Sequence, residues 1–186
     1  PLRENLAASV LVAAGWDPEE EALADPMCGA GTFSIEAAMM AKDIAPGRTM
    51  RPTVIEWPDF PRKGWNQLKR QLEEHTPSSS PRIYASDRNQ GAIRAAISNA
   101  ERAGVAASID FQQYSLGDPW DDLPEQGLVV LNPPYGKRIG EKSRIHGLYT
   151  HFGKALQQRY SGWRLAVVCP EKALAGRLAP GIQEVT

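Results

Sequence analysis

The chain alternates short apolar runs with helix-like segments, and this order constrains its fold more than any other feature. Strands are expected over residues 21–26, 82–86, 108–112, 127–131 and 164–169. Helices are expected over residues 4–14, 31–42, 90–103, 146–160 and 171–178. The run Gly127–Leu131 is apolar throughout, which is typical of a strand buried on both faces. This order predicts an α/β fold with a mostly parallel, twisted sheet and helices on both faces.

Length and composition narrow the class of protein. The chain has 186 residues, of which 42% are hydrophobic, and this content can fill the core of one domain over residues 1–186. A net charge of −1 at this apolar content excludes disorder as the main state. No apolar run reaches the roughly 18–20 residues of a membrane helix, so we expect a soluble protein. The near-zero charge also argues against a freestanding nucleic-acid-binding module, which is usually basic.

The cysteines, the histidines and the first residue bear on the redox compartment, on metal binding and on whether the chain is part of a longer protein. Cys28 and Cys169 form no CxxC pair and are too few for a disulfide framework, which favours a reducing cytoplasm. The three histidines have no metal-ligand spacing, so no metal site is expected. Because the chain begins at Pro1 and not at Met, we expect a fragment of a longer protein.

A proline-rich stretch over about residues 43–81 interrupts the alternation. Loops this long are usually functional or mobile, so we interpret the stretch as an insertion with one short helix over residues 65–75. Between residues 42 and 70, seven cations outnumber three acids, with three aromatic residues among them. This composition suits nucleic-acid phosphates and base stacking, although a solvated surface with its aromatics on the core is an open alternative. The candidate contacts here are Arg62, Lys63 and Trp65.

A glycine-containing loop follows the first expected strand. Its sequence is Asp25-Pro26-Met27-Cys28-Gly29-Ala30-Gly31-Thr32-Phe33. Two glycines one residue apart allow a tight turn and a close approach of the backbone to a ligand. Thr32 is placed to cap the next helix, whose first N–H groups favour polar or anionic ligand groups. Position 34 is Ser, so the dinucleotide fingerprint G-x-G-x-x-G is incomplete, and an ordinary strand-to-helix turn is an alternative.

An acid ends the next expected strand. The two carboxylate oxygens of Asp87 can accept both hydroxyl hydrogens of a ribose, and the alternative is that Asp87 caps the helix starting near Asn89. The spacing from Gly31 to Asp87 is far longer than the roughly 20 residues of the nicotinamide fingerprint, and the insertion accounts for the difference. Together, the glycine loop and Asp87 favour a nucleoside-binding edge.

A rigid turn, Asn132-Pro133-Pro134-Tyr135-Gly136, directly follows the buried strand at 127–131. Two prolines fix the backbone and remove two N–H donors. The Asn132 side-chain oxygen and a proline carbonyl can accept both hydrogens of an exocyclic amine on a nucleobase, and Tyr135 can stack on a flipped base. A second basic segment, residues 137–144, supplies Lys137 and Arg138 as further candidate RNA contacts. The alternative is a strand-ending turn with a packing tyrosine.

Together these motifs resemble those of class I S-adenosylmethionine-dependent methyltransferases. The loop Asp25–Thr32 resembles the cofactor loop, Asp87 the ribose-binding acid, and Asn132–Tyr135 the catalytic motif of amine-methylating members. More narrowly, that loop and the string Pro1-Leu2-Arg3-Glu4-Asn5-Leu6-Ala7-Ala8 are similar to those of THUMP-associated RNA guanine-N2 methyltransferases, nearest the bacterial enzymes of large-subunit (23S) rRNA. The resemblance covers about residues 1–178.

The resemblance implies a Rossmann-like fold, the cofactor S-adenosylmethionine, and methyl transfer to the N2 amine of a guanine in 23S ribosomal RNA. It also implies, as a partner, a THUMP RNA-binding domain elsewhere in the same parent chain. The implied catalytic residues are Asn132, Pro133, Pro134 and Tyr135. The implied cofactor-binding residues are Asp25, Pro26, Cys28, Gly29, Ala30, Gly31, Thr32, Asp87, Arg88, Ser115 and Asn132.

Two departures from the family pattern stand out. The family usually has an acid after the third strand that contacts the adenine amine, and here Ser115 falls at that place. The fold normally closes with a hairpin of strands 6 and 7, and only residues 181–186 remain for it here, so we expect that hairpin to be truncated.

Other functions stay open at this point. The Asn-Pro-Pro-Tyr chemistry serves any exocyclic amine, so DNA adenine-N6 methylation is one alternative. A cofactor-binding or RNA-docking module without activity of its own is another. An NAD dehydrogenase is disfavoured by Ser34 and by the Asn132–Tyr135 turn.

Overall fold

The sheet has the predicted parallel arrangement. The computed structural model describes residues 2–47, 52–74, 82–134, 142–169 and 171–179, and within them five parallel strands lie in the order β3-β2-β1-β4-β5. The strands are β1 (Ala22–Asp25), β2 (Ile83–Ser86), β3 (Ile109–Gln112), β4 (Gly127–Leu131) and β5 (Arg164–Val167). Central β1 pairs with β2 on one side and with β4 on the other, so the chain direction across the sheet reverses there. Ligands of such sheets bind at this switch point, beyond the carboxyl ends of the strands.

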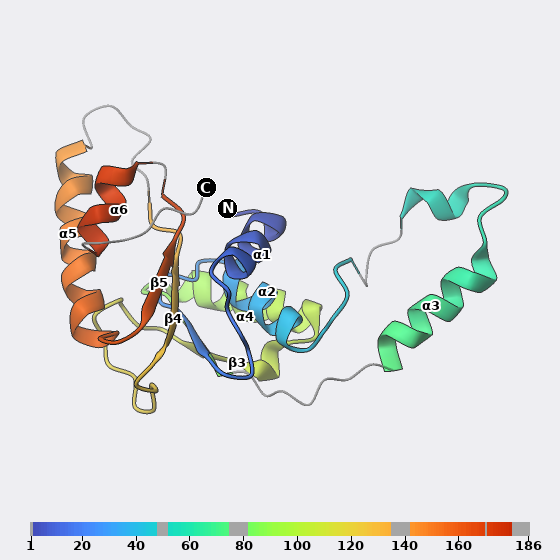
Figure 1. Ribbon diagram of the computed structural model, residues 1–186, viewed down its shortest axis with the longest axis horizontal. Helices are drawn as coiled ribbons and strands as arrows, with labels where there is room; N and C mark the ends of the chain where they lie inside the picture. Colours follow the sequence, from blue (N-terminus) through green and yellow to red (C-terminus); the bar gives the residue numbers. More distant parts are fainter. Residues whose placement is uncertain (1, 48–51, 75–81, 135–141, 170, 180–186) are drawn as a thin grey trace.

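Helices cover both faces of the sheet (Figure 1). On one face lie α1 (Glu4–Ala13), α2 (Thr32–Ala41) and α4 (Gln90–Ala103), and on the other α5 (Lys142–Arg159) and α6 (Lys172–Leu178). Successive side chains of a strand point to opposite faces. Thus Leu128 and Val130 of β4 join the first core, and Val129 and Leu131 join the second. The all-apolar run at 127–131 is therefore explained by burial on both sides.

Several element boundaries agree with the sequence, and others differ for local reasons. The expected helix at 90–103 and the expected strand at 127–131 have the predicted bounds. Helix α5 begins four residues earlier than expected, because its first turn is polar and carries no apolar period to mark it. The short helix expected at 65–75 begins at Arg62, just after Pro61. A proline before the first turn is compatible with a helix start, so the apolar pattern alone marked this start too late.

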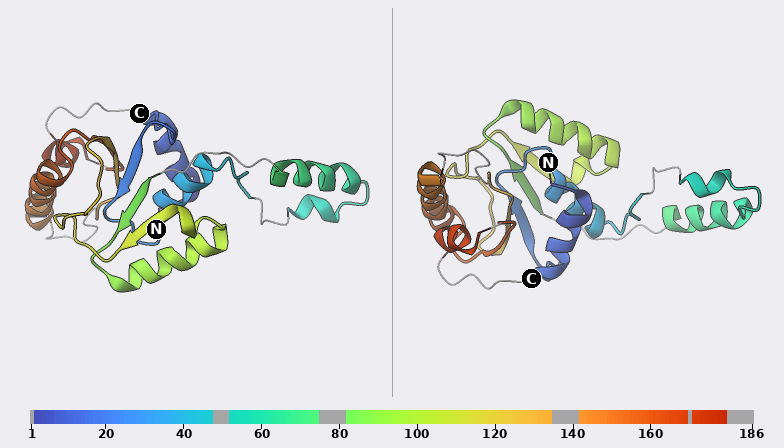
Figure 2. Two further views of the ribbon diagram at one scale, coloured as in Figure 1. Left: turned by 90° about the horizontal axis from the view of Figure 1, so that it is seen from below. Right: turned by 90° about the horizontal axis from the view of Figure 1, so that it is seen from above.

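The insertion stands away from the sheet. The structure describes in it a short 3-10 helix, η1 (Thr53–Glu56), and the helix α3 (Arg62–Glu74). We call residues 52–74 the arm. Both views of Figure 2 show the arm extending from the body beyond α2, with neither sheet face beneath it. Neither η1 nor α3 packs substantially against another helix or strand of the described ranges. The alternative that the aromatics of this region pack on the core is therefore wrong for the arm.

Two findings concern absences within the described ranges. No helix there is both long and apolar enough to cross a bilayer. Among the same residues, no group of three His, Cys, Asp or Glu side chains is arranged to hold a metal ion.

Candidate active site

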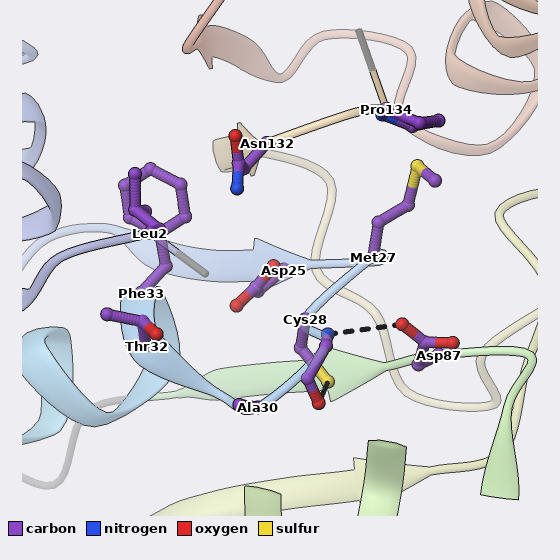
Figure 3. A pocket seen from close by; sticks show the side chains of 11 residues that line it. Leu2, Asp25, Met27, Cys28, Ala30, Thr32, Phe33, Asp87, Asn132 and Pro134 are labelled. Atoms are coloured by element: carbon purple, nitrogen blue, oxygen red, sulfur yellow. Dashed lines mark hydrogen bonds between the residues drawn. The ribbon is translucent and has the colours of Figure 1, made fainter. Parts of the chain in front are cut away.

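A cavity of about 310 Å³ lies at the carboxyl ends of β1, β2 and β4 (Figure 3). This volume falls in the usual range for small-molecule sites. The cavity brings together the glycine loop, the acid after β2 and the turn after β4. The acid lies 58 residues after Gly29 of the loop, and the turn lies about 100 residues after the loop. Its lining residues are Leu2, Asp25, Met27, Cys28, Gly29, Ala30, Thr32, Phe33, Asp87, Asn132 and Pro134.

The glycine loop depends on two left-handed backbone positions. Gly29 has φ +55° and Gly31 has φ +82°. A Cβ on Gly29 would meet no atom within 4 Å, whereas a Cβ on Gly31 would lie 3.0 Å from the Cβ of Ala96 in α4. The loop is also held to β2, because the N–H of Cys28 donates to the carbonyl of Ser86 at 2.9 Å. Gly31 therefore serves close packing, and Gly29 leaves open space at the cavity.

Asp87 holds the loop and faces the cavity. One carboxylate oxygen, Oδ2, accepts a hydrogen bond from the N–H of Gly29 at 3.1 Å. The other, Oδ1, accepts from the N–H of Asn89 at 2.8 Å. Each oxygen has a second lone pair, so the carboxylate can still accept from a ligand. The helix cap of α4 is Asn89, whose side chain accepts from Gly91 and Ala92, so the alternative that Asp87 is the cap is wrong.

The start of α2 differs from the sequence expectation. Thr32 was expected to cap this helix, but the capping position is Gly31 and no side chain caps it there. Thr32 is instead the first helical residue and lines the cavity. The expectation was wrong because the left-handed turn at Gly31 already starts the helix, which places Thr32 one position too late to cap it.

Asp25 is a buried carboxyl group at the floor of the cavity. Its side chain is 1% exposed, and its Oδ2 accepts a hydrogen bond from the hydroxyl of Ser34 at 2.7 Å. Burial raises the pKa of Asp25 to about 7, the Ser34 hydroxyl and backbone N–H oppose this rise, and Asp87 adds to it. Burial also raises the pKa of the Cys28 thiol, with Asp25 and Asp87 contributing. The thiol is therefore neutral near pH 7 and is not an activated nucleophile.

The turn after β4 is anchored from the second core. Asn132 is half-buried, Pro133 is buried, and Pro134 is exposed and lines the cavity. The hydroxyl of the buried Tyr149 in α5 donates to the carbonyl of Pro134 at 3.3 Å. Figure 3 shows Asn132 and Asp87 on either side of the cavity, with Asp25 between them. Tyr135, Lys137 and Arg138 lie outside the described residues.

The remaining candidate residues are not part of the cavity lining. Pro26 and Gly31 are buried within the loop itself. Arg88 is exposed, and its carbonyl accepts from the side chain of Gln113. Ser115 is exposed, and its N–H donates to Asp118 Oδ2 at 2.7 Å. Asp118 thus holds the backbone at Ser115, and neither residue lines the cavity.

Sequence reasoning missed three apolar lining residues, Leu2, Met27 and Phe33. Met27 and Phe33 lie in or beside the loop motif, so their proximity could have been inferred. Leu2 lies in the N-terminal string that carried the resemblance, but its place at the cavity was not predicted, because the packing of α1 against α2 brings the start of the chain there.

A comparison with known protein families identifies the family of this chain. The model of a family described as an RMKL-like methyltransferase domain matches residues 1–180. The chain belongs to that family. The RMKL-like domain therefore has here the Rossmann-like methyltransferase fold that the resemblance implied, and the loop and turn motifs lie where that fold binds ligands.

Curated relatives of this RMKL-like domain are much longer proteins. Ribosomal RNA large subunit methyltransferase K/L of Syntrophotalea carbinolica is 41% identical over 186 residues, covering 94% of this chain and 26% of the relative. The protein of the same name from Chromohalobacter salexigens is 39% identical, covering 90% of this chain and 24% of the relative. The chain thus spans about a quarter of the length of these relatives.

Solved structures share the fold. SMU.472, assigned as a methyltransferase and solved with SAH, superimposes with a TM-score of 0.86 at 26% identity, covering 96% of this chain and 47% of its own. A protein of Listeria monocytogenes assigned as an N6-adenine-specific DNA methylase gives a TM-score of 0.85 at 28% identity, with the same coverage. The RMKL-like domain therefore spans about half of each solved chain.

Proposed function

We propose that this domain transfers a methyl group from S-adenosylmethionine to the exocyclic N2 amine of a guanine in 23S ribosomal RNA. The observation that carries the proposal is that the glycine loop, Asp87 and Asn132 line one cavity at the switch point of the sheet. The names of the K/L relatives support a large-subunit rRNA substrate. Such a substrate would be met in the cytoplasm.

The residues present fit the cofactor. Asp87 offers two oxygens at the end of β2 for the ribose hydroxyls, and the missing Cβ of Gly29 leaves room for a ligand beside the backbone. The SAH of the related structure supports this choice of ligand. When bound, S-adenosylmethionine supplies a sulfonium methyl group that an amine can accept, with the carbon–sulfur electron pair returning to sulfur. The proposed cofactor-binding set remains Asp25, Pro26, Cys28, Gly29, Ala30, Gly31, Thr32, Asp87, Arg88, Ser115 and Asn132.

The turn after β4 is proposed to position the amine. The side-chain oxygen of Asn132 and the carbonyl of Pro133 would accept its two hydrogens, which directs the nitrogen lone pair at the methyl carbon. The rigid prolines and the Tyr149 bond to Pro134 keep these acceptors in place. Tyr135 is proposed to stack on the flipped base. The surplus proton would leave to Asn132, to the Pro133 carbonyl or to water.

The domain organisation is part of the same proposal. Residues 1–186 would form the catalytic domain, with the arm as its insertion, and a THUMP domain of the parent chain would bind the same rRNA. The large unmatched part of the K/L relatives is consistent with such additional domains. Lys137 and Arg138 are proposed to contact RNA next to the turn.

Labelled methyl transfer tests the proposal. The longest available form of the protein is incubated with tritium-labelled S-adenosylmethionine and an unmodified 23S rRNA transcript, and nucleosides are then analysed. We expect N2-methylguanosine, and a loss of at least about tenfold for Asn132→Ala, because positioning groups usually contribute more than that. Gln157→Ala, on an exposed part of α5, is the control and should keep full activity. No methylguanosine in the transcript would refute the assignment.

DNA adenine-N6 methylation is the second candidate. The Listeria structure favours it, and the proposed acceptors would hold an adenine amine as well as a guanine amine. The same assay with DNA separates the two, because N6-methyladenine in DNA together with unmodified RNA would reverse the assignment. A module without activity would bind S-adenosylhomocysteine in calorimetry but methylate neither substrate.

A further inference from the structure

The arm is a helix-bearing segment that the body of the domain does not support. Helix α3 has 13 residues, and in the part of the chain that the structure describes neither it nor η1 packs substantially against the other helices and strands (Figures 1 and 2). Isolated helices of this length are marginal in water. Within the arm, Phe60 and Trp65 pack edge to face with ring centres 5.9 Å apart, so the arm has only a small apolar contact of its own.

The exposed side chains of the arm are of two kinds. Trp57 is 66% exposed and Leu68 is 47% exposed, although both are large apolar residues. Four cations of α3, at 62, 63, 69 and 70, are also exposed. Among the described residues, no ion pair is recorded for these four side chains, and no acid lies between positions 62 and 70.

The order of charge along α3 is the reverse of what stabilises a helix. Cations are favourable near a helix C-terminus and acids near its N-terminus. Here Arg62 and Lys63 lie in the first turn, no cation lies in the last turn, and the sequence ends the helix with Glu73 and Glu74. The charges therefore weaken the isolated helix, and an external anion against its first half would relieve this arrangement.

The cations also share one side of the helix. At 100° per residue, Arg62, Asn66, Lys69 and Arg70 fall within about one third of the circumference. Leu68 lies roughly opposite them, and Trp65 lies beside the edge of this stripe. From residue 62 to residue 70 this stripe is about 12 Å long. A stripe of that length with long side chains matches the backbone of an oligonucleotide over a few phosphates, and the exposed indole of Trp57 offers a surface for base stacking.

We propose that the arm is an RNA-docking element, in which Arg62, Lys69 and Arg70 contact phosphates and Trp57 stacks on an unpaired base, away from the catalytic cavity. This inference rests on the proposed action on RNA. It corrects the place of one residue, because Trp65 is half-buried against Phe60 and therefore unsuited to stacking. Lys63, close to this stripe, would add to the local positive potential.

RNA binding through these cations should depend on salt concentration in a quantitative way. Each phosphate neutralised on a single strand contributes about −0.7 to the slope of log binding constant against log salt concentration. Lys69→Gln/Arg70→Gln should therefore reduce the magnitude of that slope by about 1.4. The matched control is Arg94→Gln/Lys154→Gln, which also removes one arginine and one lysine, from exposed positions on α4 and α5. The control should bind as the parent does.

RNA affinity and its salt dependence are measured by fluorescence anisotropy. The full chain is titrated into a labelled hairpin RNA that carries a 10-nucleotide single-stranded tail. We expect the arm double variant to weaken binding at least about tenfold at low salt, and Trp57→Ala to weaken it at unchanged salt slope. Thermal melting checks that each variant folds, and S-adenosylhomocysteine affinity should not change. Equal RNA affinity of the parent and the arm variants would overturn the proposal.

The outcome is distinguishable from that of the proposed function. If the parent methylates rRNA but the arm variants bind RNA normally, the docking role fails and the methyltransferase assignment stands. If the arm variants lose RNA binding but the parent methylates only DNA, the docking role stands and the rRNA substrate fails.

Discussion

The hydroxyl of Ser34 in α2 donates a 2.7 Å hydrogen bond to Asp25 at the end of β1, and both side chains are buried. Asp25 is thus an ionisable group without contact to bulk water, at the floor of a cavity proposed to bind a cationic cofactor. Burial raises the pKa of Asp25 to about 7, from an ordinary value of 3.8. The protein therefore keeps a proton at this position over a pH range in which the unfolded chain has lost it.

This shift gives a stability prediction with a definite sign. Between pH 3.8 and about 7 the folded state binds one proton more than the unfolded state, so the free energy of unfolding falls as pH rises and then levels off. Asp25→Asn should remove this fall. The free energy of unfolding of the variant minus that of the parent should therefore rise by up to about 4 kcal/mol between pH 4 and pH 8. Urea unfolding across this range measures it, with the exposed Asp121→Asn as control. Parallel curves for Asp25→Asn and the parent would contradict it.

The two loop glycines give a matched pair of stability predictions. Ala at either position is strained by positive φ, which costs about 1–2 kcal/mol. Gly31→Ala should cost about 2–4 kcal/mol, because its Cβ must also displace Ala96 of α4. Gly29→Ala should cost only the strain. Urea unfolding of the two variants compares them, and equal losses would mean that close packing at Gly31 contributes nothing.

Asp87 is predicted to act on both the loop and the cofactor. Asp87→Ala leaves the N–H groups of Gly29 and Asn89 without their acceptors, so the free energy of unfolding should fall by about 1–3 kcal/mol. S-adenosylhomocysteine binding, measured by calorimetry, should weaken by more than about tenfold, which corresponds to about 1.4 kcal/mol. Asp110→Ala, at an exposed position of the edge strand β3, serves as control. Unchanged affinity in folded Asp87→Ala would exclude Asp87 from the site.

Tyr149→Phe tests whether the turn after β4 must be held in place. The substitution removes the hydroxyl that donates to the carbonyl of Pro134 but keeps the buried ring. We expect kcat for methyl transfer to fall by about tenfold, with S-adenosylhomocysteine affinity unchanged, because only the acceptors for the amine are displaced. Tyr160→Phe removes a hydroxyl elsewhere in the same core and should leave kcat as it is. A loss of cofactor affinity without a change in kcat would contradict the assignment.

Much of the site could be predicted from local sequence. The two glycines of the loop predicted a tight turn, and the structure has positive φ at both, a backbone that other residues rarely adopt. The strand pattern placed Asp87 and Asn132 at strand ends, and the parallel order of the sheet made those ends neighbours. The start of α3 was placed too late because the apolar pattern does not mark Arg62, and the cap of α2 was misplaced because the left-handed turn at Gly31 already starts that helix.

The sequence by itself determined the alternation of strands and helices, the buried central strand and the motifs at the strand ends, because these depend on residues a few positions apart. Only the tertiary structure decided that Asp87 holds Gly29 across 58 residues, that Ser34 binds Asp25, that Leu2 reaches the cavity and that the arm stands clear of the sheet. These contacts depend on how the elements pack in three dimensions. Hydrophobic burial drives that packing, but the local sequence pattern does not specify which individual residues will contact one another.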